Sequence, residues 1–287
     1  MIKKFSFILY KILYFLDLIF YKLTKRSILV WFKEFIQNDS YKSIYILKKK
    51  INFFVPNHLT QYRVDSFFTK EPETLEWIDN FMENKNIIFW DIGANVGLYS
   101  IYAAIKFNNI KVYSFEPSTS NLRVLSRNIS INNLYNKILI NQFPLTNTNK
   151  GHQLMMESNF SEGGALHSYG KNINYEGKKL DIKNNYMLFG FSINYLIKNL
   201  NFEIPDYLKI DVDGLEHLIL EGGNQFLNDE KIKSISIEIN ENYQEQLNKV
   251  KDLMHSFNYK FIKKNQTKFI KISPEYQNSF NYIFSRD

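Results

Sequence analysis

The sequence predicts an α/β fold built on a mostly parallel sheet of seven strands. From Ile87 onward, short apolar segments alternate with segments that suit amphipathic helices, which is typical of βαβ units. The last two apolar segments have only a loop between them, so we expect them to pair as an antiparallel hairpin. The chain has 287 residues, 45% of them apolar, which is enough for one such domain and an extension.

The first 26 residues have the pattern of a basic amphipathic helix. At about 100° per residue, one side carries Lys4, Lys11, Lys22 and Lys25, and the other carries Phe5, Ile8, Leu9, Ile12, Leu16 and Ile19. The apolar side can lie on an anionic membrane, or it can pack on the rest of the protein or on a second subunit of a homodimer. The stretch 5–20 is short for a membrane span, and no signal-peptide cleavage site follows it. We therefore expect a cytoplasmic protein, with peripheral membrane contact at the inner face through residues 1–26 as one alternative.

Residues 1–55 are interpreted as an N-terminal extension, and residues 56–287 as the main domain. Within the extension, residues 44–55 predict two short strands around a lysine-rich turn. Early in the main domain, Pro72 suits the first position of a helix, and Glu73 suits the positive end of its dipole.

The main domain then alternates strands and helices. The expected strands are 87–91, 111–116, 137–142, 206–211, 233–239, 258–263 and 280–285, and the expected helices are 97–107, 118–132, 192–200, 214–221 and 242–256. Residues 143–190 interrupt this order. They are rich in Asn and Gly and long for a connection, so we expect a functional loop or insert there.

The composition limits the chemistry that the chain can perform. It has no cysteine, so disulfides, Cys-based zinc sites and a cysteine nucleophile are excluded. The net charge is +7, but the first 26 residues hold six basic residues against a single acid, Asp17. The remainder of the chain is therefore closer to neutral.

The segment DIGANVG, residues 91–97, follows the first expected strand of the sheet and precedes a helix. It does not match the dinucleotide-binding pattern G-x-G-x-x-G, because Asn95 and Leu98 replace the second and third glycines. The phosphate-binding pattern G-x-x-x-x-G-K-[ST] does not occur in the chain. Gly93 and Gly97 would let a ligand other than a phosphate come close to the backbone.

Carboxylates end two neighbouring strands at this edge of the sheet. Asp91 ends the first strand and Glu116 ends the second, where Pro117 holds Glu116 extended. Glu116 can accept both hydroxyls of a ribose, and Asp91 can face a cationic group. The pair therefore suits S-adenosylmethionine, which combines a ribose with a sulfonium and an amino acid.

Four blocks of sequence carry a resemblance to a known family. They are DIGANVGLYS at 91–100, VYSFEPS at 112–118, LKIDVDGLEHLIL at 208–220 and IEIN at 237–240. Over roughly residues 56–263 the chain resembles the FkbM family of S-adenosylmethionine-dependent methyltransferases, which have a class I Rossmann-like fold. The family often has Glu where this chain has Asp213.

The resemblance implies a seven-stranded sheet whose last strand is antiparallel, and S-adenosylmethionine as the cofactor. The cofactor-binding residues that it implies are Asp91, Gly93, Ala94, Asn95, Gly97, Tyr99, Ser100, Glu116 and Pro117, with Phe143, Pro144 and Leu145 near the adenine.

Four acids at the ends of the fourth and fifth strands are the candidate catalytic residues: Asp211, Asp213, Glu216 and Glu238. Methyl transfer to a hydroxyl requires an acceptor placed in line with the methyl group and a base that removes a proton. For Asp213 and Glu216 the alternative is a capping box at the start of helix 214–221, and His217 is interpreted as structural. Oxygen ligands from Asp211, Asp213 and Glu238 could also hold Mg²⁺, a less favoured alternative.

The resemblance also implies O-methylation, in a family associated with sugars, polysaccharides and specialised metabolites. In the insert, Tyr169, Tyr175 and Tyr186 could stack on sugar rings, and membrane contact would make a lipid-linked glycan a natural acceptor. A nucleic-acid methyltransferase and a non-catalytic scaffold are the alternatives. We expect no nucleic-acid partner, because the lysines gather at the N-terminus, and the intact acids of the cofactor blocks favour an enzyme.

Overall fold

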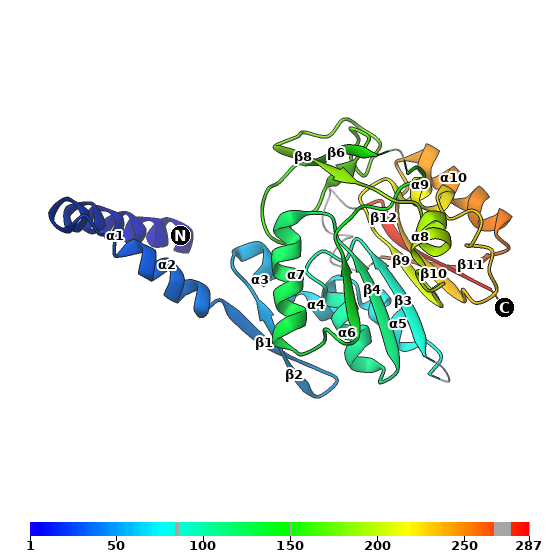
Figure 1. Cartoon of the computed structure of the whole chain (residues 1–287), viewed down its shortest axis with the longest axis horizontal. Helices are drawn as coiled ribbons and strands as arrows, with labels where there is room; N and C mark the ends of the chain where they lie inside the picture. The colour runs from blue at the N-terminus through cyan, green and yellow to red at the C-terminus, as the bar shows by residue number, and fades with distance from the viewer. Residues whose placement is uncertain (84–85, 150, 267–276, 287) are drawn as a thin grey trace. The chain divides into compact units, whose positions relative to one another are not determined.

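The computed structural model describes residues 1–83, 86–149, 151–266 and 277–286 (Figure 1). The helices are α1 (Ile2–Thr24), α2 (Leu29–Asn38), α3 (His58–Asp65), α4 (Phe67–Lys70), α5 (Pro72–Asp79), α6 (Leu98–Lys106), α7 (Thr119–Ile131), α8 (Ile193–Leu200), α9 (Glu216–Glu221) and α10 (Gln244–Ser256). The strands are β1 (Tyr41–Ile46), β2 (Lys49–Phe54), β3 (Ile87–Ile92), β4 (Ile110–Phe115), β5 (Ile138–Asn141), β6 (His152–Glu157), β7 (His167–Tyr169), β8 (Asn184–Phe189), β9 (Tyr207–Ile210), β10 (Ser234–Asn240), β11 (Lys260–Asn265) and β12 (Ser279–Ser285). The chain divides into two compact units, Met1–Lys42 and Ser43–Asp287.

Seven strands of the second unit form one sheet in the order β11-β12-β10-β9-β3-β4-β5. The five strands from β10 to β5 are parallel, and β12 runs antiparallel to both β10 and β11. The predicted α/β fold, with a mostly parallel sheet and an antiparallel C-terminal hairpin, is confirmed. The strand order reverses between β3 and β9, and ligands of open parallel sheets bind beside the carboxyl ends of strands at such a point.

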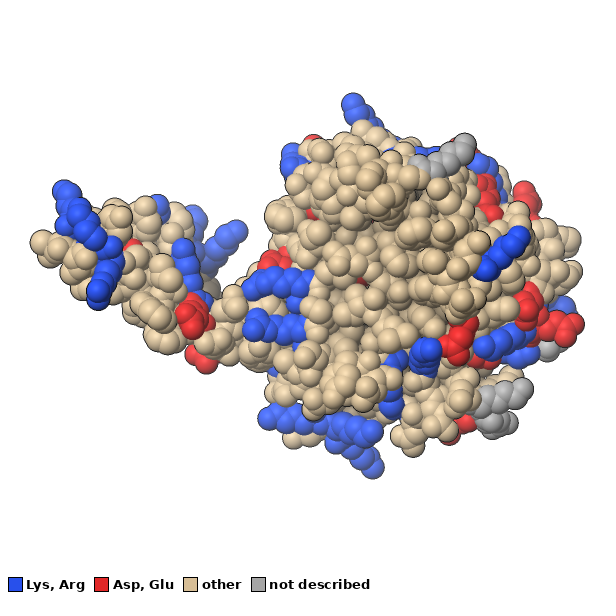
Figure 2. Space-filling model, in the orientation of Figure 1, with Lys and Arg blue, Asp and Glu red and all other residues tan. Residues whose placement is uncertain are grey.

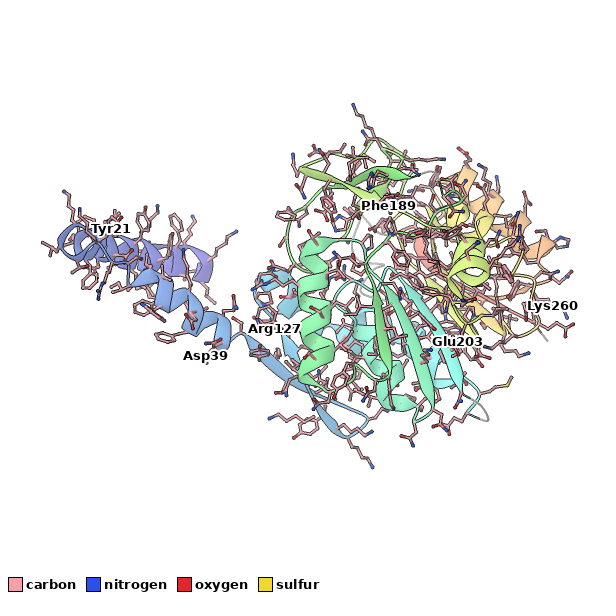
Figure 3. All side chains as sticks on the ribbon, viewed as in Figure 1. Tyr21, Asp39, Arg127, Phe189, Glu203 and Lys260 are labelled. Atoms are coloured by element: carbon pink, nitrogen blue, oxygen red, sulfur yellow. The ribbon has the colours of Figure 1, made fainter. Side chains whose placement is uncertain are left out.

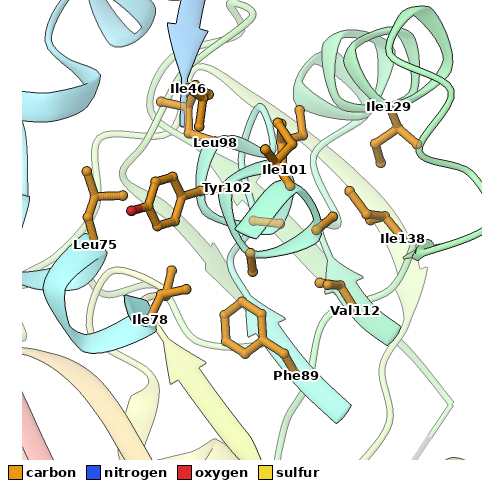
Figure 4. Close-up of a cluster of buried hydrophobic side chains, with 14 of the residues drawn as sticks. Ile46, Leu75, Ile78, Phe89, Leu98, Ile101, Tyr102, Val112, Ile129 and Ile138 are labelled. Atoms are coloured by element: carbon orange, nitrogen blue, oxygen red, sulfur yellow. The ribbon is translucent and has the colours of Figure 1, made fainter. Parts of the chain in front are cut away.

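The strand side chains alternate between two hydrophobic cores, one on each face of the sheet. Phe89 and Val112 belong to the core that α5, α6 and α7 cover, where Ile101 packs against them (Figure 4). Trp90 and Tyr113, one position further along the same strands, belong to the core under α8, α9 and α10. Burial on both faces explains why these strands have nearly continuous apolar sequences.

Strand β2 of the short β1–β2 sheet packs within the second unit. Phe53 and Phe54 are fully buried there. The backbone N–H of Phe54 donates to Oδ1 of Asn128 on α7 at 2.7 Å, and the N–H of Asn52 donates to Asn132 at 3.0 Å. Strand β2, which the sequence assigns to the N-terminal extension, therefore completes the core of the main domain.

The insert after β5 contains a three-stranded antiparallel sheet in the order β7-β6-β8. Figure 3 labels Phe189, which lies on β8 and is half exposed. The segment that the sequence predicts as an irregular insert is thus partly regular, and its strands pair across about thirty intervening residues.

The first unit contains α1 and α2. The carboxylate of Asp17 on α1 accepts hydrogen bonds from the Ser27 hydroxyl at 2.8 Å and from the backbone N–H groups of Ile28 and Leu29 at 2.6 and 3.2 Å. These bonds satisfy donors at the start of α2 and hold the two helices together. Among the described helices, none combines the length and the hydropathy of a membrane span.

Candidate active site

A cavity of about 600 Å³ lies at the carboxyl ends of β3, β4, β9 and β10, between the α3–α4 segment and the insert. This volume is within the range of small-molecule sites. The predicted site residues that line it are Gly93, Ala94, Asn95, Tyr99, Glu116, Pro117, Phe143, Pro144, Leu145, Asp211, Asp213 and Glu238. The structure therefore brings most of the cofactor-binding candidates and three of the four catalytic candidates to one cavity.

Glu116, at the end of β4, is a buried carboxylate in the wall of this cavity. The backbone N–H of Asn95 donates to one of its oxygens at 2.7 Å, and that of Ser118 donates to the other at 2.8 Å. Burial raises the Glu116 pKa to about 7, although these backbone hydrogen bonds act in the opposite direction. The two loops thus fix an acceptor group whose charge changes near neutral pH.

The two glycines after β3 serve the packing of the protein itself. Both have φ of 85°, which an L side chain rarely adopts. A Cβ on Gly93 would overlap the carbonyl oxygen of Asp211, and one on Gly97 would overlap the Leu125 side chain. The sequence predicts that a ligand comes close to the backbone at these two glycines. In the structure, other segments of the protein occupy that space.

Four predicted site residues do not line the cavity: Asp91, Gly97, Ser100 and Glu216. Direct contact between these residues and a ligand in the cavity is therefore not supported. Asp91 and Ser100 are buried beneath the loop, where the Ser100 hydroxyl donates to Asp91 at 2.5 Å. Burial raises the Asp91 pKa, and the cationic Lys209 opposes this shift. The hydrogen bond between Ser100 and Asp91 therefore supports the loop that follows β3.

Glu216 holds the turn that precedes α9. Its carboxylate accepts the backbone N–H groups of Val212 and Gly214 at 3.0 and 3.1 Å and an amide hydrogen bond from Gln246. Burial raises the Glu216 pKa to about 7, with these backbone bonds opposing. This bonding places Glu216 among structural residues.

Asp213 does not cap α9, so the predicted capping box is wrong. The N-cap position is Leu215, which has no side-chain cap. Asp213 has φ of 60°, and its carboxylate accepts the backbone N–H groups of Leu166 and His167 in the insert, at 2.7 and 3.3 Å. Asp213 therefore joins the end of β9 to the insert.

A charged network at the base of the cavity includes residues that sequence reasoning missed. Lys209 is 1% exposed, and its Nζ lies 2.5 Å from Asp211. Lys70 pairs with the buried Glu71 at 2.9 Å. The signal for Lys209 was present in the sequence, because a lysine within an apolar strand requires a charged partner.

Asp211 and Glu238 share a hydrogen bond within this network. Burial alone would raise the Asp211 pKa, but Lys209 and this bond lower it to about 2. Burial and the neighbouring Asp211 raise the Glu238 pKa well above its ordinary value. The low pKa makes Asp211 a weak base, and the raised pKa of Glu238 favours its protonated form.

Asp211, Asp213 and Glu238 each have a contact within the protein, with Lys209, with the backbone of the insert and with Asp211 respectively. Within the described residues, no group of three or more His, Asp or Glu side chains is arranged to hold a metal ion.

His167, on β7 of the insert, lies at the cavity wall, and sequence reasoning missed it. Both ring nitrogens are buried and have no hydrogen-bond partner in the described part of the chain. The charge of His167 lowers the Asp213 pKa, against the raising effects of burial and Asp211. The imidazole lies beside the Asp213 carboxylate, and it can accept a proton from a ligand once a ring nitrogen is exposed to the cavity.

Two of the three tyrosines expected to contact an acceptor reach the cavity. Tyr169 and Tyr175 line it. Tyr186 does not, because its hydroxyl donates to Glu157 at 2.9 Å and accepts the N–H of Thr119 at 3.1 Å. Tyr186 therefore joins the insert to α7, and the expectation that it stacks on a sugar is corrected.

Comparisons with known proteins identify the family of this chain. The model of the methyltransferase FkbM domain matches residues 91–261, which is more than half of the chain. Methyltransferase sdnD of Sordaria araneosa is 28% identical over 164 residues, which are 50% of this chain and 62% of that protein. The chain thus covers less than two thirds of this relative.

Solved structures of methyltransferases are distant neighbours. Methyltransferase FkbM of Methylobacillus flagellatus KT has 13% identity and a TM-score of 0.47, with 72% of this chain and 44% of that chain covered. Precorrin-6y C5,15-methyltransferase of Geobacter metallireducens GS-15 has 12% identity and a TM-score of 0.42, with 76% and 87% covered. These two similarities carry no functional argument. The match to the domain model shows that the chain belongs to the FkbM methyltransferase family.

Proposed function

We propose that this methyltransferase transfers a methyl group from S-adenosylmethionine to a hydroxyl of a sugar or glycan. The observation that carries the proposal is that one cavity joins Glu116, a fixed acceptor suited to a ribose, to His167, an unpartnered base. The two groups come from opposite walls, the sheet edge and the insert.

The residues at the sheet edge fit the cofactor. S-adenosylmethionine supplies an activated methyl group when bound. The Glu116 carboxylate can accept the ribose hydroxyls with the lone pairs that remain beside its bonds to the Asn95 and Ser118 backbone and to the Asn121 side chain. Phe143, Pro144 and Leu145 give an apolar wall for the adenine, and the ionised Asp211 offers negative charge for a cationic group.

The acceptor hydroxyl needs a base, and we assign this role to His167. Of the predicted catalytic acids, Asp211 is paired with Lys209, Glu238 has a raised pKa and borders Asp211, and Glu216 lies outside the cavity. Both ring nitrogens of His167 are buried, so we propose that acceptor binding exposes one of them to the hydroxyl. That nitrogen then takes the proton, and Asp213 beside it stabilises the resulting positive charge. Asp211, Asp213 and Glu238 then serve as positioning residues.

The insert supports a sugar as the acceptor. Tyr175, which is partly exposed, offers aromatic surface on which a sugar ring can stack, and the buried Tyr169 lines the wall beside it. Ser158, Asn159 and Lys70 add hydroxyl, amide and ammonium groups that can bond to sugar hydroxyls. A lipid-linked glycan is the acceptor that we would test first.

The experiment is transfer of a labelled methyl group from S-adenosylmethionine to extracted glycolipids, with RNA as a parallel substrate. We expect label in the glycolipids. His167→Gln should lower the turnover number by about 10² to 10⁴-fold and leave cofactor binding unchanged, because it removes only the base.

His152→Gln is the matched control, because His152 lies on the adjacent strand β6 against Phe189 and does not line the cavity. Label in RNA alone would refute the sugar assignment. Equal turnover of the His167→Gln and His152→Gln proteins would refute the assignment of His167 as the base.

A further inference from the structure

The α1–α2 unit exposes an unusually large apolar surface. The large apolar residues of the two helices that are exposed are Ile2, Phe5, Phe7, Ile8, Leu9, Tyr10, Ile12, Leu13, Tyr14, Phe15, Leu16, Leu18, Ile19, Phe20, Tyr21, Leu23, Val30, Trp31, Phe32, Phe35 and Ile36. Patches of this size on soluble proteins mark sites that bind another apolar surface. Figure 3 labels Tyr21, which is one of these residues.

The exposed charges of α1 are all positive. The helix has one acid, Asp17, and its carboxylate is buried against Ser27 and the first N–H groups of α2. Burial would raise the Asp17 pKa, but these hydrogen bonds lower it, so the group is ionised and turned inward. The charged side chains that remain exposed are Lys3, Lys4, Lys11 and Lys22. Figure 2 shows basic side chains, in blue, over this unit.

The lysines and the aliphatic residues occupy neighbouring sectors of α1. At about 100° per residue, Lys4, Lys11 and Lys22 fall together, and Ile8, Ile12, Leu16 and Ile19 form a second group centred about 80° round the helix from them. Tyr10, Tyr14 and Tyr21 lie beside the lysines, and Lys11 contacts the Tyr14 ring at 5.8 Å. Tyrosine and lysine together are typical of the headgroup region of a bilayer.

We propose that the α1–α2 unit binds the surface of an anionic lipid bilayer, with the aliphatic side of α1 in the acyl region and the lysines among the headgroups. Lys11, in the middle of the helix, is costly inside the hydrocarbon and favourable at the surface. A second copy of the chain fits this surface less well than an anionic bilayer, because it would bring the same positive charges together. This inference does not depend on the proposed function.

The test is flotation of the full chain with vesicles of phosphatidylcholine, with or without phosphatidylglycerol. Wild type should bind the vesicles that contain phosphatidylglycerol. Lys11→Gln should lower binding to them about five-fold, the equivalent of about 1 kcal/mol for one lysine near an anionic surface. Ile12→Glu should lower binding much further, at least 50-fold, because it also removes apolar burial.

Tyr14→Glu is the matched control for Ile12→Glu, since it places the same acid on the lysine side and should cost only about as much as Lys11→Gln. Thermal melting of each variant checks that the main domain is folded. The proposal is overturned if wild type stays unbound with both vesicles, or if Ile12→Glu and Tyr14→Glu behave alike. Self-association without lipid binding would assign the surface to a second copy.

Discussion

Gly93 has a positive φ and also lies close to the Asp211 carbonyl oxygen. Alanine substitutions can separate the energetic effects of these two features. Gly93→Ala should lower the free energy of unfolding by about 3 kcal/mol, because alanine at positive φ costs about 1–2 kcal/mol and its Cβ would overlap the Asp211 carbonyl oxygen. Gly151→Ala is the control, because φ there is 70° but no atom lies within 4 Å of the added Cβ. Urea unfolding of both variants measures the difference, and equal losses would show that Asp211 makes no close contact.

The place of Glu116 in the cavity could be predicted from the sequence, but the role of Asp213 could not. Glu116 ends a strand next to the strand of the glycine loop, and the parallel order of the sheet alone brings it to the cavity. Asp213 followed by Glu216 has the spacing of a capping box, but its bond partners lie about 47 residues earlier, in the insert. Local spacing carries no information about such a partner.

At the scale of elements, Asp17 links α1 to α2. Asp17→Ala should speed hydrogen exchange at the amides of Ile28 and Leu29 about five-fold, because loss of an N-terminal cap costs about 1 kcal/mol. Asp39→Ala, at the other end of α2 (Figure 3), is the control and should leave these amides unchanged. Unchanged exchange in Asp17→Ala would show that the carboxylate does not hold the helix start.

The main sheet could be predicted from the sequence, and the insert sheet could not. Strands β3, β4 and β9 are buried apolar runs with helices between them, so their type and order are visible locally. Strands β6 and β8 pair across the long Asn- and Gly-rich segment, and β8 is only half buried. His167 lies in this sheet, which explains why the best candidate for the base was not found.

At the scale of the whole molecule, the two proposals converge on one kind of acceptor. A glycan joined to a lipid presents its sugar at a membrane surface, and the α1–α2 unit has the charge and apolar area to bind that surface. Residues 1–26 and the cavity can be tested independently, because flotation does not require the cofactor.

The measurement that most directly tests the cavity as a cofactor site is isothermal titration with S-adenosylhomocysteine as a function of pH. The ribose hydroxyls should donate to an ionised Glu116, whose pKa is about 7. Because protonation competes with binding, affinity should fall about ten-fold for each pH unit below 7 and level off above it.

Glu116→Gln should bind more weakly and lose this pH dependence. Glu216→Gln is the matched control, because Glu216 also has a pKa of about 7 but lies outside the cavity, and it should keep the dependence. Binding by Glu116→Gln that equals wild type in strength and in pH dependence would contradict the account.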